Sequence, residues 1–341
     1  MEEIIIKVPR NLILDLTIEF INSFKDINKE ARYVFDFEEQ RRIDPFSLLL
    51  LSSELALFKG QNEGSEFVAR NFKHCEYPAH MGFFQAFGMD FGNIPNTVVR
   101  NNDRYIPMRL FDVSDIKQAA RDMNVNPGEV LQDYAEDIGK VLTQDSEEAN
   151  SVDDKILREI LSYSIREILR NIVEHSDSKQ FGFCAQYLPS QDVVSFSVLD
   201  RGMGIRNSLS NNPKLTLSSD LEAIRESLKP GVSGKVYVGQ KNKPKGIWAN
   251  SGYGLYMTSN ICKMGGSFFI ASGDKGLYFT DKDEKILDVK IEGTALNLAI
   301  NLNQKNKLSE ILKKLRDSAG STDIKASQST MNKSRSKSNS E

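Results

Sequence analysis

Three polar side chains share one face of a helix predicted over residues 156–173, whose apolar residues recur at helical spacing. Glu167, Asn171 and Glu174 follow one another at i, i+4 and i+7, so they stack on a face other than the apolar one. A carboxylate can take a proton from water, and an amide oxygen can ligate Mg2+ beside a bound phosphate. Taken alone, the same stripe also fits a solvated helix face.

Glycine-containing segments further along the chain add to this helix. Asp200-Arg-Gly-Met-Gly204 follows residues 193–199, a run with strand composition. An Asp at the end of a buried strand can accept a hydrogen bond from an exocyclic amino group, and glycines let backbone approach a ligand closely. Residues 250–255 (NSGYGL) open an apolar-periodic helix, where free N–H groups favour phosphate. Gly293-Thr294 precedes a predicted strand at 295–300.

In this order, the segments resemble the ATP-binding domain of the gyrase, chaperone, histidine-kinase and mismatch-repair (GHKL) superfamily, over residues 150–302. Each motif by itself is common, and the resemblance depends on four of them in the family's order. Glu167-x-x-x-Asn171 is similar to the N-box, Asp200-x-Gly202-x-Gly204 to the G1 box, Gly252-x-Gly254-Leu255 to the G2 box, and Gly293-Thr294 to the last short motif.

The resemblance implies a Bergerat-type α/β sandwich, in which helices cover one face of a mixed sheet and a lid at about 206–251 closes over ATP. The lysines and glycines between 229 and 246 suit a loop beside phosphates, although they also suit plain solvation. Arg201 and Arg206, which flank the G1 box, are expected only to be solvated.

The resemblance also implies a role for each site residue. Glu167 would orient or deprotonate the attacking group, and Asn171 would hold Mg2+. Asp200 would read the adenine amino group. The remaining residues would complete the cofactor site: Gly202 and Gly204 around the adenine, Gly252, Gly254 and Leu255 at the phosphates, and Thr294 behind the adenine contact.

The N-terminal part has its own pattern. Residues 32–37 read as a short strand, and a helix is predicted to start with Asp44 as N-cap and Pro45 at the first position. With a short helix at 78–88, this order resembles a STAS domain, the fold of anti-anti-sigma factors. In partner-switching domains a Ser in that turn is phosphorylated, and Ser47 is the nearest candidate. A Ser47 hydroxyl that only caps its own helix is favoured, because the motif departs from the usual Ser position.

These observations predict an α/β chain of the α+β kind with two cores, for which 341 residues suffice. The expected parts are a STAS-like regulatory domain at 1–112, a helical connector at 113–150, a GHKL ATP-binding domain at 151–303, and a polar, disordered tail at 304–341.

Composition narrows the cellular setting. A hydrophobic fraction of 40% and a formal net charge of −3 describe an ordinary globular protein without a general affinity for nucleic acid or membrane. The first residues, MEEIIIK, are acidic and lack a signal-peptide pattern, so the expected compartment is the cytoplasm. Three scattered cysteines indicate neither a disulfide framework nor a zinc cluster.

Two functions follow from the sequence. The first is Mg2+-dependent ATP hydrolysis or phosphoryl transfer to a protein Ser or Thr, acting as a switch coupled to the N-terminal domain. The second is a non-catalytic module whose bound ATP controls partner binding. Both imply ATP and Mg2+ as cofactors and a protein partner or substrate. A homodimer is a further expectation, because segments before the N-box often mediate dimerisation in the superfamily.

Overall fold

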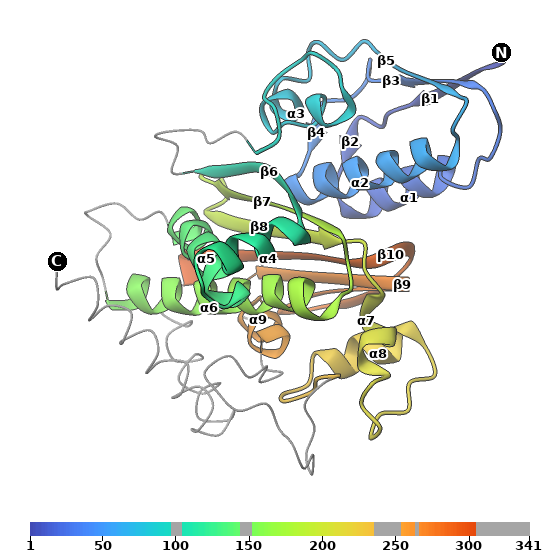
Figure 1. Cartoon of the computed structure of the whole chain (residues 1–341). Coiled ribbons are helices and arrows are strands. Elements are labelled where there is room, and N and C mark those ends of the chain that lie inside the picture. Colours follow the sequence, from blue (N-terminus) through green and yellow to red (C-terminus); the bar gives the residue numbers. More distant parts are fainter. Residues whose placement is uncertain (97–103, 144–151, 235–253, 263–265, 305–341) are drawn as a thin grey trace.

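The computed structural model describes residues 1–96, 104–143, 152–234, 254–262 and 266–304. These residues stack as alternating layers: a small sheet, helices, a larger sheet, and further helices (Figure 1). The chain is therefore an α+β protein that contains both parallel and antiparallel strand pairs. Among the described residues, no helix combines the length and apolar character that a membrane crossing requires. The expected tail lies outside the described residues, except for its first position.

The N-terminal unit is built on a parallel sheet in the order β1-β3-β5. Its strands are β1 (Glu3–Lys7), β3 (Arg32–Asp36) and β5 (Glu66–Arg70), with a small pair β2 (Asn11–Leu12) and β4 (Arg42–Ile43) beside them. The helices are α1 (Leu14–Phe24), α2 (Pro45–Gln61), the short α3 (Glu76–His80) and the 3-10 turn η1 (Gln85–Phe87). The predicted helix start is confirmed, because the Asp44 side chain accepts a hydrogen bond from the Ser47 N–H at 2.7 Å.

The larger sheet runs in the order β6-β7-β8-β10-β9. Its strands are β6 (Tyr105–Asp112), β7 (Gln180–Leu188), β8 (Val193–Asp200), β9 (Gly266–Thr280) and β10 (Glu284–Asn301). All described pairings in it are antiparallel. The expected mixed sheet is therefore wrong for this part of the chain. The short connections between β7 and β8 and between β9 and β10 form hairpins, which can join only antiparallel strands.

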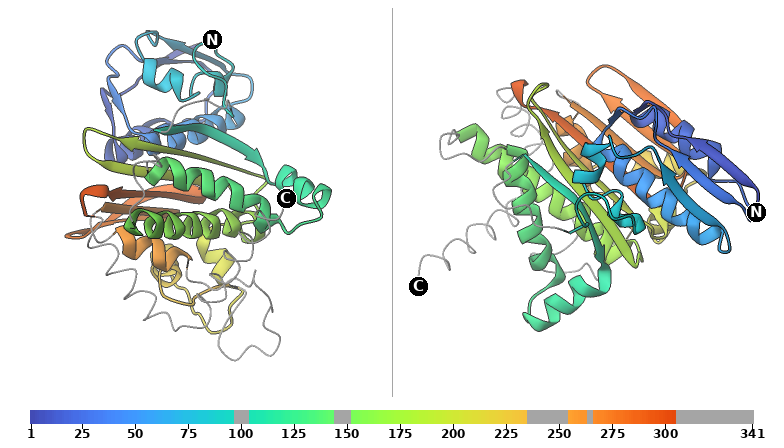
Figure 2. Two further views of the ribbon diagram at one scale, coloured as in Figure 1. Left: turned by 90° about the vertical axis from the view of Figure 1, so that its left-hand side faces the viewer. Right: turned by 90° about the horizontal axis from the view of Figure 1, so that it is seen from above.

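Helices cover one face of this sheet (Figure 2). They are α4 (Val113–Asp122), α5 (Pro127–Thr143), α6 (Val152–His175) and α9 (Gly254–Cys262). The helix predicted at 156–173 is confirmed as part of α6, and the expected connector at 113–150 contains the helices α4 and α5. Two more helices, α7 (Gly204–Leu209) and α8 (Asp220–Ser227), lie beyond the end of β8, and a 3-10 turn η2 (Leu302–Gln304) follows β10.

The opposite face of the larger sheet is covered by α2 of the N-terminal unit. The Phe46 ring packs edge-on against the Phe269 ring of β9, with 5.2 Å between the ring centroids. The Cys184 Sγ of β7 donates a hydrogen bond to the Pro45 carbonyl oxygen at 3.4 Å. Residues 48–51, four consecutive leucines, are all at most 1% exposed. The first half of α2 is buried throughout and lies between the two sheets, whereas Ala56, Lys59 and Gly60 nearer its C-terminal end are exposed. The expected helices do cover one face of the larger sheet, and α2 adds a helix on its other face.

This arrangement changes the expected organisation of the chain. The strand at 105–112 was placed in the N-terminal domain, but it is β6, the edge strand of the larger sheet. Within the expected connector, α4 and α5 contribute buried residues to the core beneath that sheet. Ser47 is completely buried in α2, so its hydroxyl is not accessible to a kinase in this fold.

The contact between α2 and the larger sheet predicts how the protein unfolds. Phe46→Ala should lower the free energy of unfolding by about 3–5 kcal/mol, the usual cost of removing a buried ring. The loss should appear as a shift of one common urea transition, monitored by circular dichroism, because α2 belongs to the cores on both of its sides. Leu16→Ala, at a side chain that is 38% exposed, is the control and should change the midpoint little. Two separate transitions in the wild-type protein would contradict this prediction.

Candidate functional site

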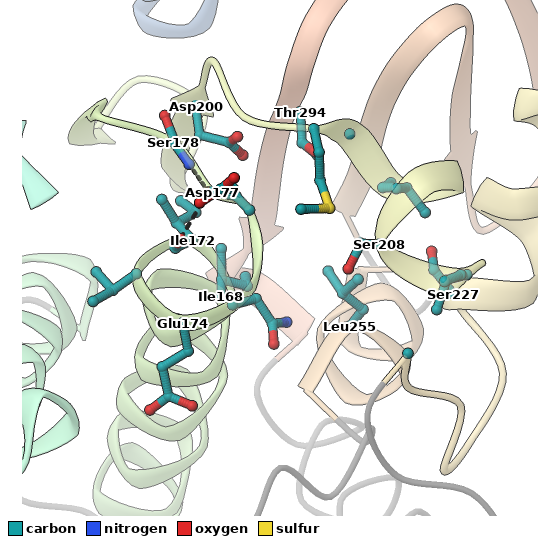
Figure 3. A pocket seen from close by; sticks show the side chains of 18 of the residues that line it. Ile168, Ile172, Glu174, Asp177, Ser178, Asp200, Ser208, Ser227, Leu255 and Thr294 are labelled. Atoms are coloured by element: carbon teal, nitrogen blue, oxygen red, sulfur yellow. Dashed lines mark hydrogen bonds between the residues drawn. The ribbon is translucent and has the colours of Figure 1, made fainter. Parts of the chain in front are cut away.

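A cavity of about 460 Å3 lies between α6, the C-terminal end of β8, residues 294–296 of β10, and the helices α7, α8 and α9. Its floor is apolar: Val198, Ile270 and Leu296 come from three strands of the larger sheet, and Ile168 and Ile172 come from α6. An apolar floor surrounded by polar side chains is typical of a small-molecule site. Figure 3 shows Asp200 and Thr294 on the sheet side of this cavity, and Ser208, Ser227 and Leu255 across from them.

Asp200 is the polar group at the sheet end of the cavity. It is the last residue of β8, it lies opposite Thr294 of β10 in the strand register, and it is only 3% exposed. Burial raises the pKa of the Asp200 carboxyl to about 6, while the Gly202 N–H, the Arg201 guanidinium and the Thr294 hydroxyl act in the opposite direction. A carboxylate in this setting gains from a ligand that donates a hydrogen bond to it.

The turn after Asp200 depends on glycine. The Gly202 N–H donates to Asp200 Oδ1 at 2.7 Å, and a Cβ on Gly202 would lie 2.0 Å from the Ser176 carbonyl oxygen. Gly204 has a φ of 76°, which favours glycine. Gly293, beside Thr294, has a φ of 90°, and a Cβ there would lie 2.1 Å from the Asp200 carbonyl oxygen. The sequence motif therefore reflects close backbone contacts around the carboxylate.

The polar face of α6 divides between two environments. Asn171 and Glu174 both line the cavity. The Glu174 carboxylate accepts a hydrogen bond from Arg170 Nε at 2.9 Å. In Figure 3 the Glu174 side chain extends away from Asp200 and Thr294. Asn171 is thus the member of the predicted stripe that offers an amide to the cavity wall.

Glu167 lies apart from the described lining of the cavity. It is 4% exposed, and its Oε1 lies 3.4 Å from Arg166 Nη2 and 3.7 Å from Arg170 Nη1. A Cβ on Gly254, the first residue of α9, would approach the Glu167 Cβ to 2.6 Å. In this structure Glu167 joins α6 to α9 and balances two buried arginines.

Some of the remaining predicted residues line the cavity, and others lie outside the described residues. Leu255 lines the cavity at the start of α9, whereas Gly252 lies outside the described residues. The expected lid at 206–251 is described only as far as residue 234, and that part includes α8. Ser233 and Gly234, at the end of the described part, line the cavity.

Sequence reasoning missed several lining residues. Lys117 of α4 and Met203 of the G1 turn both line the cavity, and so does Ser178, which accepts a hydrogen bond from the Arg201 N–H at 3.2 Å. Lys117 lies on a helix that only tertiary packing brings to the site, so no local pattern could identify it. Met203 and Ser178 adjoin predicted motifs and could have been found by their position.

A search of the described residues finds no group of three or more His, Cys, Asp or Glu side chains arranged to hold a metal ion. Comparison of the chain with known protein families finds no match, and comparison with curated proteins finds none either. The chemistry of the site therefore rests on its own residues.

The glycine contacts predict a sharp difference between two substitutions. Gly202→Ala should lower the free energy of unfolding by about 1–3 kcal/mol or more, since the new Cβ would have to displace the Ser176 backbone. Gly60→Ala on α2 is the control, because a Cβ there meets nothing within 4 Å and alanine favours helix. Chemical denaturation of both variants measures the difference. Equal stability of the two would contradict the close approach at Gly202.

Proposed function

We propose that the chain binds ATP in this cavity and acts as a GHKL-type regulatory switch. The observation that supports this most is the buried Asp200 carboxylate, with Thr294 beside it, in a cavity with an apolar floor. The apolar floor suits the face of a base, and the carboxylate suits an amino group on that base. The carboxylate alone would fit an amino group of adenine or guanine. The order of the motifs, which resembles the GHKL superfamily, favours adenine.

Asn171 and the start of α9 are the proposed phosphate end. Mg2+ bound with a nucleotide usually takes only one or two protein oxygens, the rest of its ligands being water and phosphate. The Asn171 amide at the cavity wall fits that requirement without a cluster of carboxylates. Mg2+ would neutralise phosphate charge there. Leu255 lies in the first turn of α9, where backbone N–H groups favour an anion.

Whether bound ATP is turned over is a separate question. Glu167, four residues before Asn171, supports hydrolysis or transfer to a protein hydroxyl, because a pure binder has no need of a carboxylate there. Its ion pairs with Arg166 and Arg170 favour the second function, a module that binds ATP without turnover. In that case ATP acts through different affinities for two conformations that a protein partner distinguishes.

The first test concerns the base. Asp200→Asn should weaken ATP binding by about 10- to 100-fold, the range for a hydrogen bond to a charged group. The affinity for inosine triphosphate, which has a carbonyl in place of the adenine amino group, should fall much less in this variant. Isothermal titration of both nucleotides measures this. Asp192→Asn is the matched control, because Asp192 directly precedes the first residue of β8. This variant should bind both nucleotides as the wild type does. Equal losses for the two nucleotides would remove Asp200 from base recognition.

The raised pKa of Asp200 predicts a pH dependence of ATP binding. Below about pH 6 the carboxyl is protonated, so it presents a proton to the donor amino group and ATP binding should weaken. The same shift means that, between the ordinary Asp pKa of 3.8 and about pH 6, the nucleotide-free fold binds more protons than the unfolded chain, so its stability should fall as pH rises through that window. Titration between pH 5 and 8 should show the binding change in the wild type and not in Asp200→Asn.

Turnover is tested with γ-labelled ATP and Mg2+, followed both as free phosphate and as label on protein. Label retained on the chain and lost in Glu167→Gln indicates a kinase, and free phosphate lost in that variant indicates an ATPase. Bound ATP without either signal indicates the non-catalytic module. Asn171→Ala should reduce the Mg2+ dependence of ATP binding in all three cases. If Glu167→Gln lowers only the stability of the protein and leaves turnover unchanged, Glu167 has no role beyond its ion pairs with the arginines.

A further inference from the structure

Arg201 connects the proposed nucleotide site to the N-terminal unit. It directly follows Asp200, yet its guanidinium lies against α2: Nη2 donates to Glu54 Oε1 and Nε donates to Ser53 Oγ, both at 2.8 Å. Nη1 reaches the Glu292 carbonyl of β10 at 3.3 Å. The expectation that Arg201 is only solvated is wrong, since its side chain is 18% exposed and that of Glu54 is 6% exposed.

The backbone between the two sides of the turn has little freedom. The Arg201 N–H donates to Ser178 Oγ at 3.2 Å, and the Met203 N–H donates to the Ser176 carbonyl at 2.6 Å. On the other side, a Cβ on Gly293 would lie 2.8 Å from the Arg201 Cα. Because this turn is held on both sides, Asp200 and Arg201 lie on one constrained backbone segment, with Asp200 at the cavity and Arg201 against α2.

The other ion pairs at this junction are of a different kind. Lys290 of β10 pairs with Asp26 at 3.1 Å, and Lys285 pairs with Asp15, all with largely exposed side chains. Exposed pairs of this sort contribute little to stability and are screened by salt. Lys25 of α1 donates to the Lys290 carbonyl at 2.9 Å and lies within electrostatic reach of Glu54. Among the ion pairs described at this junction, Glu54–Arg201 is the buried one, and its arginine directly follows Asp200 in the chain.

We propose that Glu54 of α2, acting through Arg201, is a positioning residue for the base end of the nucleotide site. The N-terminal unit thereby sets how well Asp200 meets the amino group of the base, and a bound nucleotide in turn favours one packing of α2 against the sheet. This proposal rests on the proposed function, because it concerns the same cavity.

The physical reason is the cost of leaving a buried charge unpaired. Glu54 of α2 is buried against the larger sheet, so its separation from Arg201 would leave a buried charge unpaired and is strongly unfavourable. The pair therefore moves as a unit with α2. Coupling between the two sides follows by linkage: a partner that shifts α2 changes nucleotide affinity, and the nucleotide changes the affinity for that partner by the same factor.

The test compares two nucleotides in variants of the full chain. Glu54→Gln keeps the size of the side chain but removes its charge, and it should weaken ATP binding by about 5- to 10-fold, within the range of coupling effects at a distance. The affinity for inosine triphosphate should fall less. The ratio of the ATP affinity to the inosine triphosphate affinity, which measures discrimination between the two nucleotides, should therefore become smaller. In the double variant with Asp200→Asn, the two losses should not add, because both act on one contact.

Controls separate positioning from stability. Asp26→Asn removes an exposed ion pair of the same junction and should leave the discrimination unchanged. Arg201→Lys keeps a cation near Glu54, so this variant should retain part of the discrimination between the two nucleotides. If Glu54→Gln does not fold, Arg201→Lys is measured in its place. Unchanged discrimination in the folded variants, with normal ATP binding by the wild type, overturns the proposal and leaves the proposed function standing. Failure of the wild type to bind ATP overturns both.

Discussion

The burial of α2 between two sheets is the constraint on which the rest of this structure depends. The four consecutive leucines of α2 point to all sides of the helix, so its first half needs apolar partners all round. The parallel sheet provides Tyr33 and Phe35 on one side, and the larger sheet provides Phe269 and Ala295 on the other. The N-terminal unit is therefore joined to the larger sheet by a shared core, which is a tighter connection than a surface contact between two domains.

That shared core explains why the larger sheet is buried on both faces. Helices α5, α6 and α9 take one face and α2 takes the other, so every central strand is enclosed. The cavity lies where β8 ends and where α7 and α8 extend beyond the sheet. Asp200 and Thr294 are opposite each other in the strand register at that point.

Three buried carboxylates, those of Asp200, Glu54 and Glu167, are stabilised in the same way. Asp200 has hydrogen-bond donors around it, while Glu54 has Arg201, and Glu167 has two arginines. Buried carboxylates are tolerated only when such partners offset the loss of hydration. Asp200 differs from the other two because it faces a cavity, so a ligand can reach it. Its neighbour Arg201 faces the protein, and this alternation links the cavity to α2.

The local pattern of residues determined much of this protein. Apolar spacing located α6, the strand composition before Asp200 located β8, and Asp44-Pro45 located the start of α2. These signals succeed because hydrogen bonding and capping act over a few residues. The resemblance to the GHKL superfamily implied that Asp200, Thr294 and Asn171 belong to one site, and all three line the cavity.

Tertiary packing decided the rest. The pairing of β8 with β10, the place of β6 at the sheet edge and the second layer over the far face depend on contacts between segments far apart in the chain. Lys117 and Glu54 have no local signature, and only the folded chain shows the two arginine partners of Glu167. A periodic pattern indicates which face of a helix is polar, but only the folded chain decides whether that face meets water, a ligand or another charge.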